Sequence, residues 1–339
     1  MKPVIAITMG DPSGIGPEII LKALSKSSIY DKCRPFAIGS ADVFRKSAKA
    51  IDIPCAIHAI KNSEDAVFCP GTIDVLDQNS IDTNRLKIGE VSPDSGKAAY
   101  LAVEGAIRLA MSGKADATVT APLNKEALHA AGYNYSGHTE IYADLTGTKH
   151  YCMLLIHENL RVVHVSTHVS LREACNRCKK DRELEVIRLA WQACLDMGIA
   201  HPRIGVAGLN PHCGENGLFG DEEIKEITPA IEQALQEGIT VEGPVPPDSV
   251  FSKARGGFYD IVVAQYHDQG HIPLKVIGFV YDENAHKWKS VSGVNITLGL
   301  PIIRTSVDHG TAFDQAWKGT ASADSMINAI DYAVLLSKH

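Results

Sequence analysis

The sequence predicts an α/β protein with a largely parallel sheet, divided into two domains. Short apolar runs of strand length alternate with longer segments in which apolar residues recur at helical spacing, and this alternation is typical of parallel α/β folds. The chain has 339 residues, enough for two domains of roughly 150 residues each. Several apolar runs end directly in polar turns, which is where open α/β sheets bind their ligands.

The first strand and helix form a clear βα unit. Val4–Thr8 is an apolar run, and the turn after it leads into a helix over Glu18–Ser25, with Pro17 suited to the first helical position. The turn reads Gly-Asp-Pro-Ser-Gly-Ile-Gly, so it lacks the G-x-G-x-x-G dinucleotide fingerprint, and the chain contains no phosphate-binding P-loop motif. The turn fits a tight structural turn and a ligand-contacting loop equally well.

The remaining elements continue the same rhythm. Ser92 fits the N-cap of a long helix that has Pro93 in its first turn and ends at Gly113. The charged segment Val280–Ser292 is predicted to be a surface excursion. Further strands are predicted at Pro35–Ile38, Ala117–Thr120, Cys152–Ile156, Arg161–Val165, Arg203–Ala207, Ile261–Ala264, Val294–Thr297 and Pro301–Val307. Further helices are predicted at Ala41–Ala50, Glu140–Thr146, Asp181–Met197 and Glu222–Gln236 and at the end of the chain.

The composition excludes several kinds of partner. A net charge of −7 argues against nucleic acid and anionic membranes, because both require a basic surface. No apolar run reaches the roughly 18 residues of a membrane span, and the N-terminus fits a strand better than a signal peptide. Among the eight Cys, Cys175 and Cys178 form an isolated C-x-x-C pair, which favours packed or exposed thiols over a zinc or redox site. A cytoplasmic protein with reduced thiols is therefore expected.

Three of the predicted strands each lead into a histidine. Arg161–Val165 is followed by His168, Arg203–Ala207 by His212, and Ile261–Ala264 by His267. The carboxyl ends of parallel strands lie at one edge of a sheet, so three imidazoles meeting there could hold a divalent cation and leave positions open for substrate. A single histidine is more often structural, and only the repetition at equivalent strand ends favours metal binding.

A second group of residues suits an anion. Lys275 and Arg304 are the usual partners of phosphate, and His138 and Thr139 lie at a predicted helix start, where backbone N–H groups favour negative charge. The turn His309–Ala312 contains a glycine that could let a ligand approach the backbone. Each signal is weak alone, and together they indicate a phosphate or carboxylate ligand.

The combination of motifs resembles the 4-hydroxythreonine-4-phosphate dehydrogenase family from end to end. The motifs that carry the resemblance are Met9–Glu18, Gly137–Glu140, Val165–His168, Asn210–His212, Tyr266–Gly270, Val294–Thr297 and Arg304–Ala312. The resemblance implies an isocitrate/isopropylmalate-dehydrogenase-like fold of two α/β domains with the active site in the cleft between them. Residues 1–130 and 295–339 would form the first domain, and residues 131–294 the second, which would hold most metal ligands and dimer contacts.

The resemblance also implies the roles of the site residues. The metal ligands would be His168, His212 and His267, holding Zn, Mg, Co or Mn, with one ligand donated across a homodimer in which both subunits share the active sites. The substrate contacts would be His138, Thr139, Lys275, Asn295 and Arg304. The turn His309, Gly310, Thr311 and Ala312 would bind NAD, and Asp248 or Asp268 would be the general base or orient it.

Two features depart from the vitamin B6 pattern of this family. His271-Ile272-Pro273 stands where that enzyme usually has a more apolar run, and Val280–Ser292 lengthens the following loop. The first feature resembles the branch that oxidises D-threonate or D-erythronate 4-phosphate, giving dihydroxyacetone phosphate and CO₂, and it makes His271 a candidate for substrate choice. The alternatives are 4-hydroxythreonine-4-phosphate dehydrogenase itself and, more distantly, a phosphate acyltransferase-like enzyme.

Overall fold

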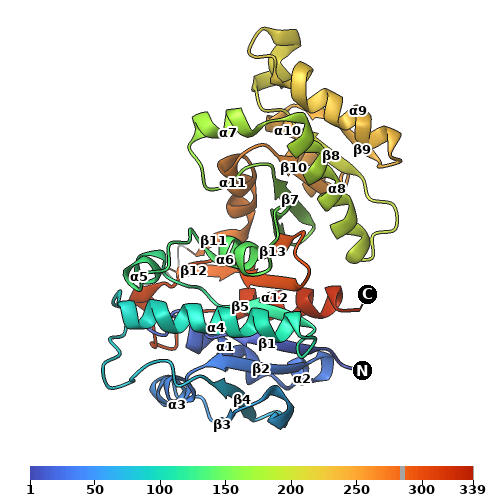
Figure 1. Ribbon diagram of the computed structural model, residues 1–339. Helices are drawn as coiled ribbons and strands as arrows, with labels where there is room; N and C mark the ends of the chain where they lie inside the picture. Colours follow the sequence, from blue (N-terminus) through green and yellow to red (C-terminus); the bar gives the residue numbers. More distant parts are fainter. Residues whose placement is uncertain (283–286, 339) are drawn as a thin grey trace. The chain divides into compact units, whose positions relative to one another are not determined.

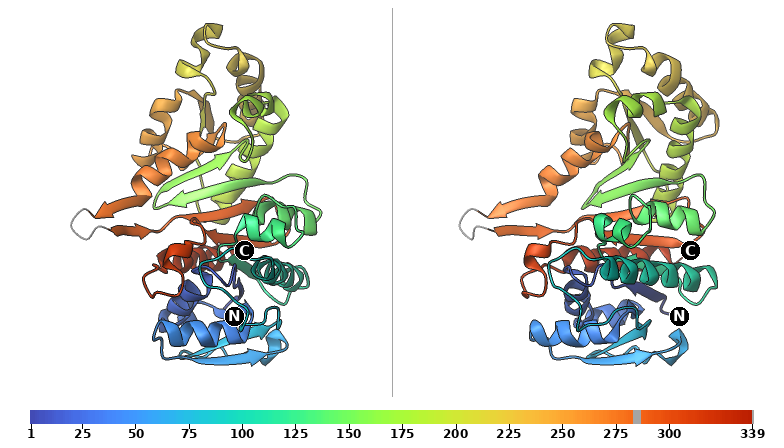
Figure 2. Two further views of the ribbon diagram at one scale, coloured as in Figure 1. Left: turned by 90° about the vertical axis from the view of Figure 1, so that its left-hand side faces the viewer. Right: turned by 60° about the vertical axis from the view of Figure 1, so that its left-hand side comes forward.

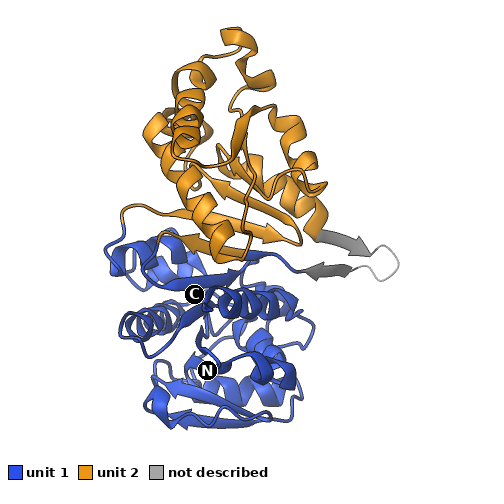
Figure 3. Ribbon diagram, turned by 90° about the vertical axis from the view of Figure 1, so that its right-hand side faces the viewer, with its two compact units in different colours: residues 1–148, 290–294, 300–339 blue, residues 149–289, 295–299 orange. Residues whose placement is uncertain are grey.

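The computed structural model describes residues 1–282 and 287–338 (Figure 1). Contacts divide the chain into two compact units, coloured separately in Figure 3. Unit 1 comprises residues 1–148, 290–294 and 300–339, and unit 2 comprises residues 149–289 and 295–299. By this division residues 131–148, which the sequence analysis places in the second domain, belong to unit 1.

Unit 1 contains strands in the order β3-β4-β2-β1-β5-β14. Neighbouring strands from β3 to β14 pair in parallel. The strands are β1 (Val4–Thr8), β2 (Arg34–Gly39), β3 (Ala56–Ile60), β4 (Thr72–Asp77), β5 (Ala117–Thr120) and β14 (Ile303–Val307). The helices are α1 (Gly16–Leu24), α2 (Ser27–Lys32), α3 (Ala41–Ala50), α4 (Pro93–Met111), α5 (Lys125–Ala130), α6 (His138–Leu145) and α12 (Asp324–Leu336).

The core of unit 1 follows from its apolar strands. The central strand β5 is buried along its whole length, as expected when helices cover both faces of a parallel sheet. Small residues of α4, including Ala102 and Ala106, let the helix pack closely on Phe36 and Ile38 of β2. The long helix begins as predicted, because the Ser92 side chain accepts a hydrogen bond from the Ser95 N–H.

Unit 2 contains strands in the order β13-β6-β7-β10-β8-β9. The pairs from β7 to β9 are parallel, whereas β6 and β7 form the antiparallel hairpin seen side by side in Figure 2. The strands are β6 (Cys152–His157), β7 (Leu160–His164), β8 (Ile204–Ala207), β9 (Val241–Val245), β10 (Ile261–Ala264) and β13 (Val294–Leu298, whose first residue counts with unit 1). The helices are α7 (Leu171–Arg177), α8 (Lys180–Asp196), α9 (Thr228–Gln236), α10 (Pro247–Arg255) and α11 (His267–Gly278).

Several elements differ from the predictions. The polar cluster after β10, for which no helix was predicted, forms the first turns of α11, which continues through Pro273. The predicted helix Glu222–Gln236 is divided into a π-helical turn at Glu223–Ile227 and α9. Strands β3, β4 and β9 were not predicted. The segment predicted as a surface excursion contains the paired strands β11 (Phe279–Asp282) and β12 (Lys287–Val291), and residues 283–286 between them lie outside the described residues.

No helix in the described ranges combines the length and apolarity needed to cross a membrane. Cys178 is buried, and its thiol donates to Glu183 at 3.5 Å, while Cys175 is partly exposed. Burial raises the pKa of the Cys178 thiol far above its usual value, so this thiol remains protonated. The C-x-x-C pair therefore contains one buried structural thiol, in keeping with the preference for a packing role.

Candidate functional site

The three strands that lead into histidines are direct neighbours in unit 2. β10 lies between β7 and β8, and all three run in parallel. Ala264 pairs with His164 of β7, and Val263 pairs with Val206 of β8, so the strands end nearly level with one another. The expected meeting of these strand ends at one edge of the sheet is therefore confirmed.

A cavity of about 450 Å³ lies at this edge. The rings of His168 and His267 both line it, with their centroids 5.7 Å apart. The remaining lining residues come from the loops after β7 and β10, from α7 and from the first turn of α11, and are Thr167, Val169, Ser170, Leu171, Ala174, Tyr266 and Asp268. The cavity thus combines two imidazoles and a carboxylate with an apolar wall, a composition typical of small-molecule sites.

Helix α11 adds a second histidine to His267. His271 follows one helical turn later, and the two rings stack with centroids 3.6 Å apart. His164, at the end of β7, lies 4.9 Å from His271 between ring centroids. His164 was not among the predicted site residues, whereas His271 was predicted as a determinant of substrate choice. The i, i+4 spacing on a helix was the signal that could have revealed the stacked pair.

His271 and His164 are neutral supporting groups. Burial, together with the nearby His267, lowers the pKa of His271 to about 4, and burial, together with His271, lowers the pKa of His164 to about 3. The Nδ1 atom of His271 lies 2.8 Å from the backbone oxygen of His267. Gly270 is required here, because a Cβ atom at that position would lie 2.3 Å from Nε2 of His164. These contacts hold the first turn of α11 against β7.

His267 itself is oriented by a carboxylate. Its Nδ1 atom lies 2.7 Å from Oδ1 of Asp268, so Nε2 is the ring atom left for a ligand. A histidine that shares its other nitrogen with a carboxylate is the usual arrangement around protein-bound metals. The side chain of His267 is 37% exposed, which leaves it accessible from solvent.

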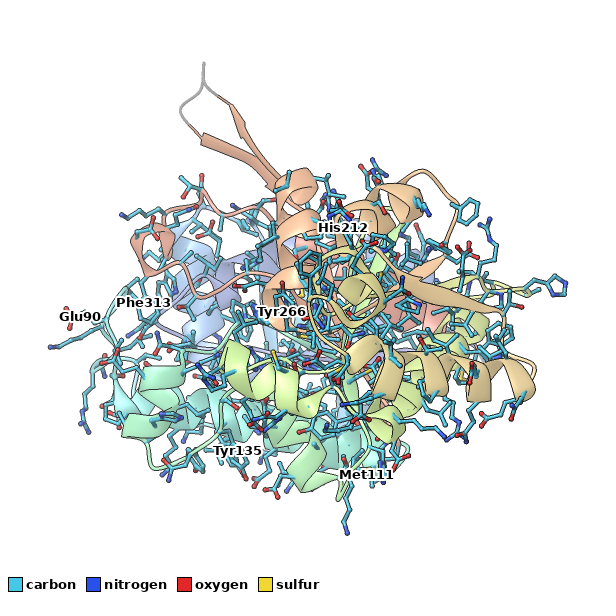
Figure 4. All side chains as sticks on the ribbon, turned by 90° about the horizontal axis from the view of Figure 1, so that it is seen from above. Glu90, Met111, Tyr135, His212, Tyr266 and Phe313 are labelled. Atoms are coloured by element: carbon cyan, nitrogen blue, oxygen red, sulfur yellow. The ribbon has the colours of Figure 1, made fainter. Side chains whose placement is uncertain are left out.

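His212 lies in the turn after β8. Its side chain is 69% exposed, with Nδ1 3.9 Å from Oε2 of Glu215. His212 and Tyr266, which follow β8 and β10, are labelled in Figure 4. Within residues 1–282 and 287–338, no three His, Cys, Asp or Glu side chains form a closed metal-binding group. The structure thus brings His168 and His267 together, while His212 is exposed to solvent in the turn that follows the neighbouring strand β8.

The donor set nevertheless suits a divalent cation. Imidazole nitrogens from His168, His212 and His267 are ligands that zinc, cobalt and manganese accept, and the three come from adjacent strand ends. The tentative bases lie in the same unit. Asp268 is 71% exposed beside His267, and Asp248 is an exposed residue in the first turn of α10.

The expected anion contacts divide between the two units. Lys275 on α11 and Asn295 on β13 belong to unit 2, whereas His138, Thr139 and Arg304 belong to unit 1. In unit 1 the guanidinium of Arg304 is buried, donates to Oγ1 of Thr120 at 2.9 Å and lies 5.6 Å from the centre of the Tyr142 ring. Burial lowers the pKa of Arg304 to about 10, so the side chain keeps its charge at neutral pH.

His138 begins helix α6 next to this charge. Burial, together with Arg304, lowers the pKa of His138 well below its usual value. The imidazole is therefore neutral at pH 7 and can act as a hydrogen-bond donor through one nitrogen. A buried guanidinium and a neutral imidazole at a helix start are groups that suit an anionic ligand, despite the acidic net charge of the chain.

The turn His309–Ala312 contacts the loop that follows β1 in unit 1, which contains Asp11. The Ile15 N–H donates to the backbone carbonyl oxygen of Thr311 at 3.0 Å. Asp11 in that loop is fully buried, and its Oδ2 atom has no hydrogen-bond partner within the described part of the chain. Burial raises the pKa of Asp11 to about 6, and the Ser13 N–H opposes this shift. Asp11 was not among the predicted site residues, because the burial of an acid cannot be recognised from a turn motif.

Comparisons with known proteins give consistent results. The family model described as "Pyridoxal phosphate biosynthetic protein PdxA" matches residues 31–333. The chain is 48% identical over 338 residues to the D-threonate 4-phosphate dehydrogenase of Pectobacterium atrosepticum, covering 99% of this chain and 100% of that protein. It matches the crystal structure of 4-hydroxythreonine-4-phosphate dehydrogenase from Klebsiella pneumoniae with a TM-score of 0.86 and 46% identity, over 99% of this chain and 100% of that chain.

A more distant match concerns the fold alone. The isocitrate dehydrogenase of Methylococcus capsulatus aligns over 98% of this chain and 85% of its own, with a TM-score of 0.50 and 12% identity. Together with the match to the Klebsiella enzyme, it confirms the predicted isocitrate/isopropylmalate-dehydrogenase-like fold class.

Proposed function

Since this chain belongs to the PdxA family of pyridoxal phosphate biosynthetic proteins, we propose that it is a metal-dependent, NAD-linked dehydrogenase of a 4-phosphorylated four-carbon hydroxy acid. The preferred substrates are D-threonate and D-erythronate 4-phosphate. When bound, NAD would supply the hydride acceptor for C3, and a base on the chain would take the proton of the C3 hydroxyl. The resulting β-keto acid would lose its carboxylate as CO₂, and the enolate left at C2 would take up a proton to give dihydroxyacetone phosphate.

The observation that carries the proposal is the pair of imidazoles in the cavity at the strand edge. His168 and His267 face a common space, and His212 follows the adjacent strand. These three residues would hold one Zn, Mg, Co or Mn ion. A bound divalent cation supplies Lewis acidity that lowers the pKa of a substrate hydroxyl. Asp268 or Asp248 would accept the proton, and Asp268 also orients His267 through Nδ1.

The remaining site residues would bind and orient. Lys275, Asn295, His138, Thr139 and Arg304 would contact the substrate and its phosphate, so that phosphate binding energy positions C3 for hydride transfer. The charge of buried Arg304 and the neutral ring of His138 support this assignment. The turn formed by His309, Gly310, Thr311 and Ala312 would bind NAD, with the Asp11 loop beneath it. A cytoplasmic location is part of the proposal, because all eight cysteines are free thiols.

A homodimer with shared active sites is also part of the proposal. Ile272 and Val276, one turn apart on α11, are 60% and 72% exposed, and apolar side chains on the helix that begins with His267 are suited to a subunit contact.

Light scattering should give twice the 36.5 kDa chain mass. Val276→Asp should give monomers of low activity, whereas Val67→Asp, at an apolar side chain of unit 1 that is 55% exposed, should leave the dimer intact. Full activity in a monomeric Val276→Asp variant would contradict shared sites.

Substrate preference is tested by following NADH absorbance with a panel of phosphorylated acids. D-threonate and D-erythronate 4-phosphate should give kcat/KM values about tenfold or more above that of 4-hydroxythreonine 4-phosphate, since a site adapted to a hydroxyl discriminates against an amine. His271 would act on this choice through His267, because its own ring is buried. The reverse order of kcat/KM would favour the first alternative, a 4-hydroxythreonine-4-phosphate dehydrogenase.

A phosphate acyltransferase-like enzyme is the more distant alternative. It would transfer an acyl group between phosphate and a thiol carrier without reducing NAD and would remain active after treatment with a chelator. Formation of NADH with any acid in the panel, together with its loss on chelation, separates the two reaction classes.

A further inference from the structure

The turn that carries His212 is built around a buried carboxylate. Glu223, in the π-helical turn before α9, is 2% exposed. Its Oε1 atom accepts the Asn210 N–H at 2.7 Å, and its Oε2 atom accepts Nδ2 of Asn210 at 2.9 Å. A Cβ atom at Gly214 would lie 2.9 Å from Oε2 of Glu223, so the backbone closes directly around this carboxylate.

Four non-glycine residues of the same turn adopt an unfavourable left-handed backbone conformation. The φ angles of His212, Cys213, Glu215 and Asn216 are 52°, 56°, 43° and 54°. Left-handed conformations are unfavourable for residues other than glycine, and they persist where the surrounding structure fixes them. The two hydrogen bonds from Asn210 to Glu223 lie at the base of this run and supply such a constraint.

A second side chain connects the turn to helix α11. Gln269 is 8% exposed and follows His267 in the first turn of the helix. Its Nε2 atom donates to the Gly208 oxygen at 2.8 Å, and its Oε1 atom accepts the Gln265 N–H at 2.7 Å. Gln265 in turn donates from Nε2 to the Ala207 oxygen at 2.9 Å. Two amide side chains, Gln265 just after β10 and Gln269 in the first turn of α11, thus hold the end of β8.

We propose that Gln269 and Glu223 are positioning residues for the strand-edge metal site. Gln269 fixes the separation between the helix that starts at His267 and the turn that carries His212. Glu223 fixes the backbone conformation from which the His212 ring is presented. Neither side chain contacts the metal or the substrate. This inference rests on the proposed function, because it assumes that His212 and His267 bind the same cation.

The test is the affinity of chelator-treated full-length protein for Zn²⁺, measured by competition with a chromophoric chelator. Gln269→Leu, which keeps the side-chain size and removes both hydrogen bonds, should weaken Zn²⁺ binding about 10–100-fold, the range observed for groups that support metal ligands. Glu223→Gln, which keeps an acceptor for the Asn210 N–H, should weaken it by a smaller factor. It also provides a second measurement if Gln269→Leu fails to fold.

A double-mutant cycle separates positioning from a general structural effect. In a His212→Ala background, Gln269→Leu should cause no further loss of Zn²⁺ affinity, because the ligand it positions is already absent. The matched control is Gln78→Leu in unit 1, where Nε2 of Gln78 donates to the Leu101 oxygen at 2.9 Å. This variant should bind Zn²⁺ like the wild type.

The outcomes distinguish failure of the positioning roles from failure of the metal assignment. If the wild type binds Zn²⁺ and His212→Ala weakens it, but Gln269→Leu and Glu223→Gln bind as tightly as the wild type, the positioning roles are wrong and the proposed function stands. An equal loss from Gln269→Leu with and without His212 likewise overturns the positioning role. If the wild type binds no Zn²⁺, or His212→Ala has no effect, both the metal assignment and this inference fail.

Discussion

His212→Ala is expected to abolish NADH production while leaving the protein folded. Loss of a proposed metal ligand should cost more activity than the roughly 10–100-fold typical for groups that only support such ligands. The side chain is 69% exposed, and substitutions at such surface positions usually change the free energy of unfolding by less than about 0.5 kcal/mol. Steady-state NADH formation and a urea unfolding curve on the same preparation measure both effects.

His201→Ala is the matched control for this variant. His201 is an exposed histidine just before β8, at the opposite end of the strand from His212. It should retain wild-type activity and Zn²⁺ affinity. Near-normal NADH production by His212→Ala in buffer supplied with the metal would remove His212 from the ligand set.

Glu18→Ala is expected to lower the free energy of unfolding by about 2–4 kcal/mol, because it removes a buried carboxylate and leaves its donors unpaired. Glu18 is fully buried in α1. Its oxygens accept the Ala321 N–H at 2.9 Å, the Gly319 N–H at 3.2 Å and the Lys22 amine at 2.8 Å. The carboxylate thus anchors the segment that connects the His309–Ala312 turn to α12, and urea unfolding monitored by fluorescence measures the loss.

The control for Glu18 is a carboxylate in an exposed ion pair. Glu64 lies 2.9 Å from Lys114 on the surface of unit 1, where such pairs contribute little because of solvent screening. Glu64→Gln should leave the unfolding curve nearly unchanged. If Glu18→Ala also left the unfolding curve nearly unchanged, Glu18 would not anchor the 319–321 segment.

The sequence predicted the central strands well, because strands buried on both faces read as continuous apolar runs. Val4–Thr8 and Ile261–Ala264 match β1 and β10 without adjustment. The peripheral strand β3 was missed, since most of its residues are exposed or half-buried. Strand β9 was missed because it contains Gly243 and Pro244, and both residue types usually argue against a strand.

Helix α11 was missed for a similar reason. Gly270 and Pro273 both disfavour a helix interior, and tertiary packing overrides them. Gly270 is tolerated because His164 occupies the space a side chain would need. His271 stacks on His267 because both lie on this helix, so the stacking could not be anticipated without predicting the helix.

Part of the candidate site could be predicted from the sequence, because the carboxyl ends of parallel strands lie at a common edge of the sheet. The adjacency of β7, β10 and β8 and the pairing of His168 with His267 followed that rule. The left-handed turn at His212 could not be foreseen, because it depends on Glu223, which is distant from the strand-end motif. The metal-binding, substrate-binding, NAD-binding and catalytic roles of the site residues all remain predictions.

The metal requirement is tested by titrating chelator-treated wild-type protein with Zn²⁺ or Co²⁺ and recording NADH formation after each addition. Activity with a 4-phosphorylated hydroxy acid should be lost on chelation and return in proportion to bound metal, reaching its maximum near one ion per chain. The same titration of His212→Ala should restore little activity. Full NAD reduction by the metal-free protein would contradict the account.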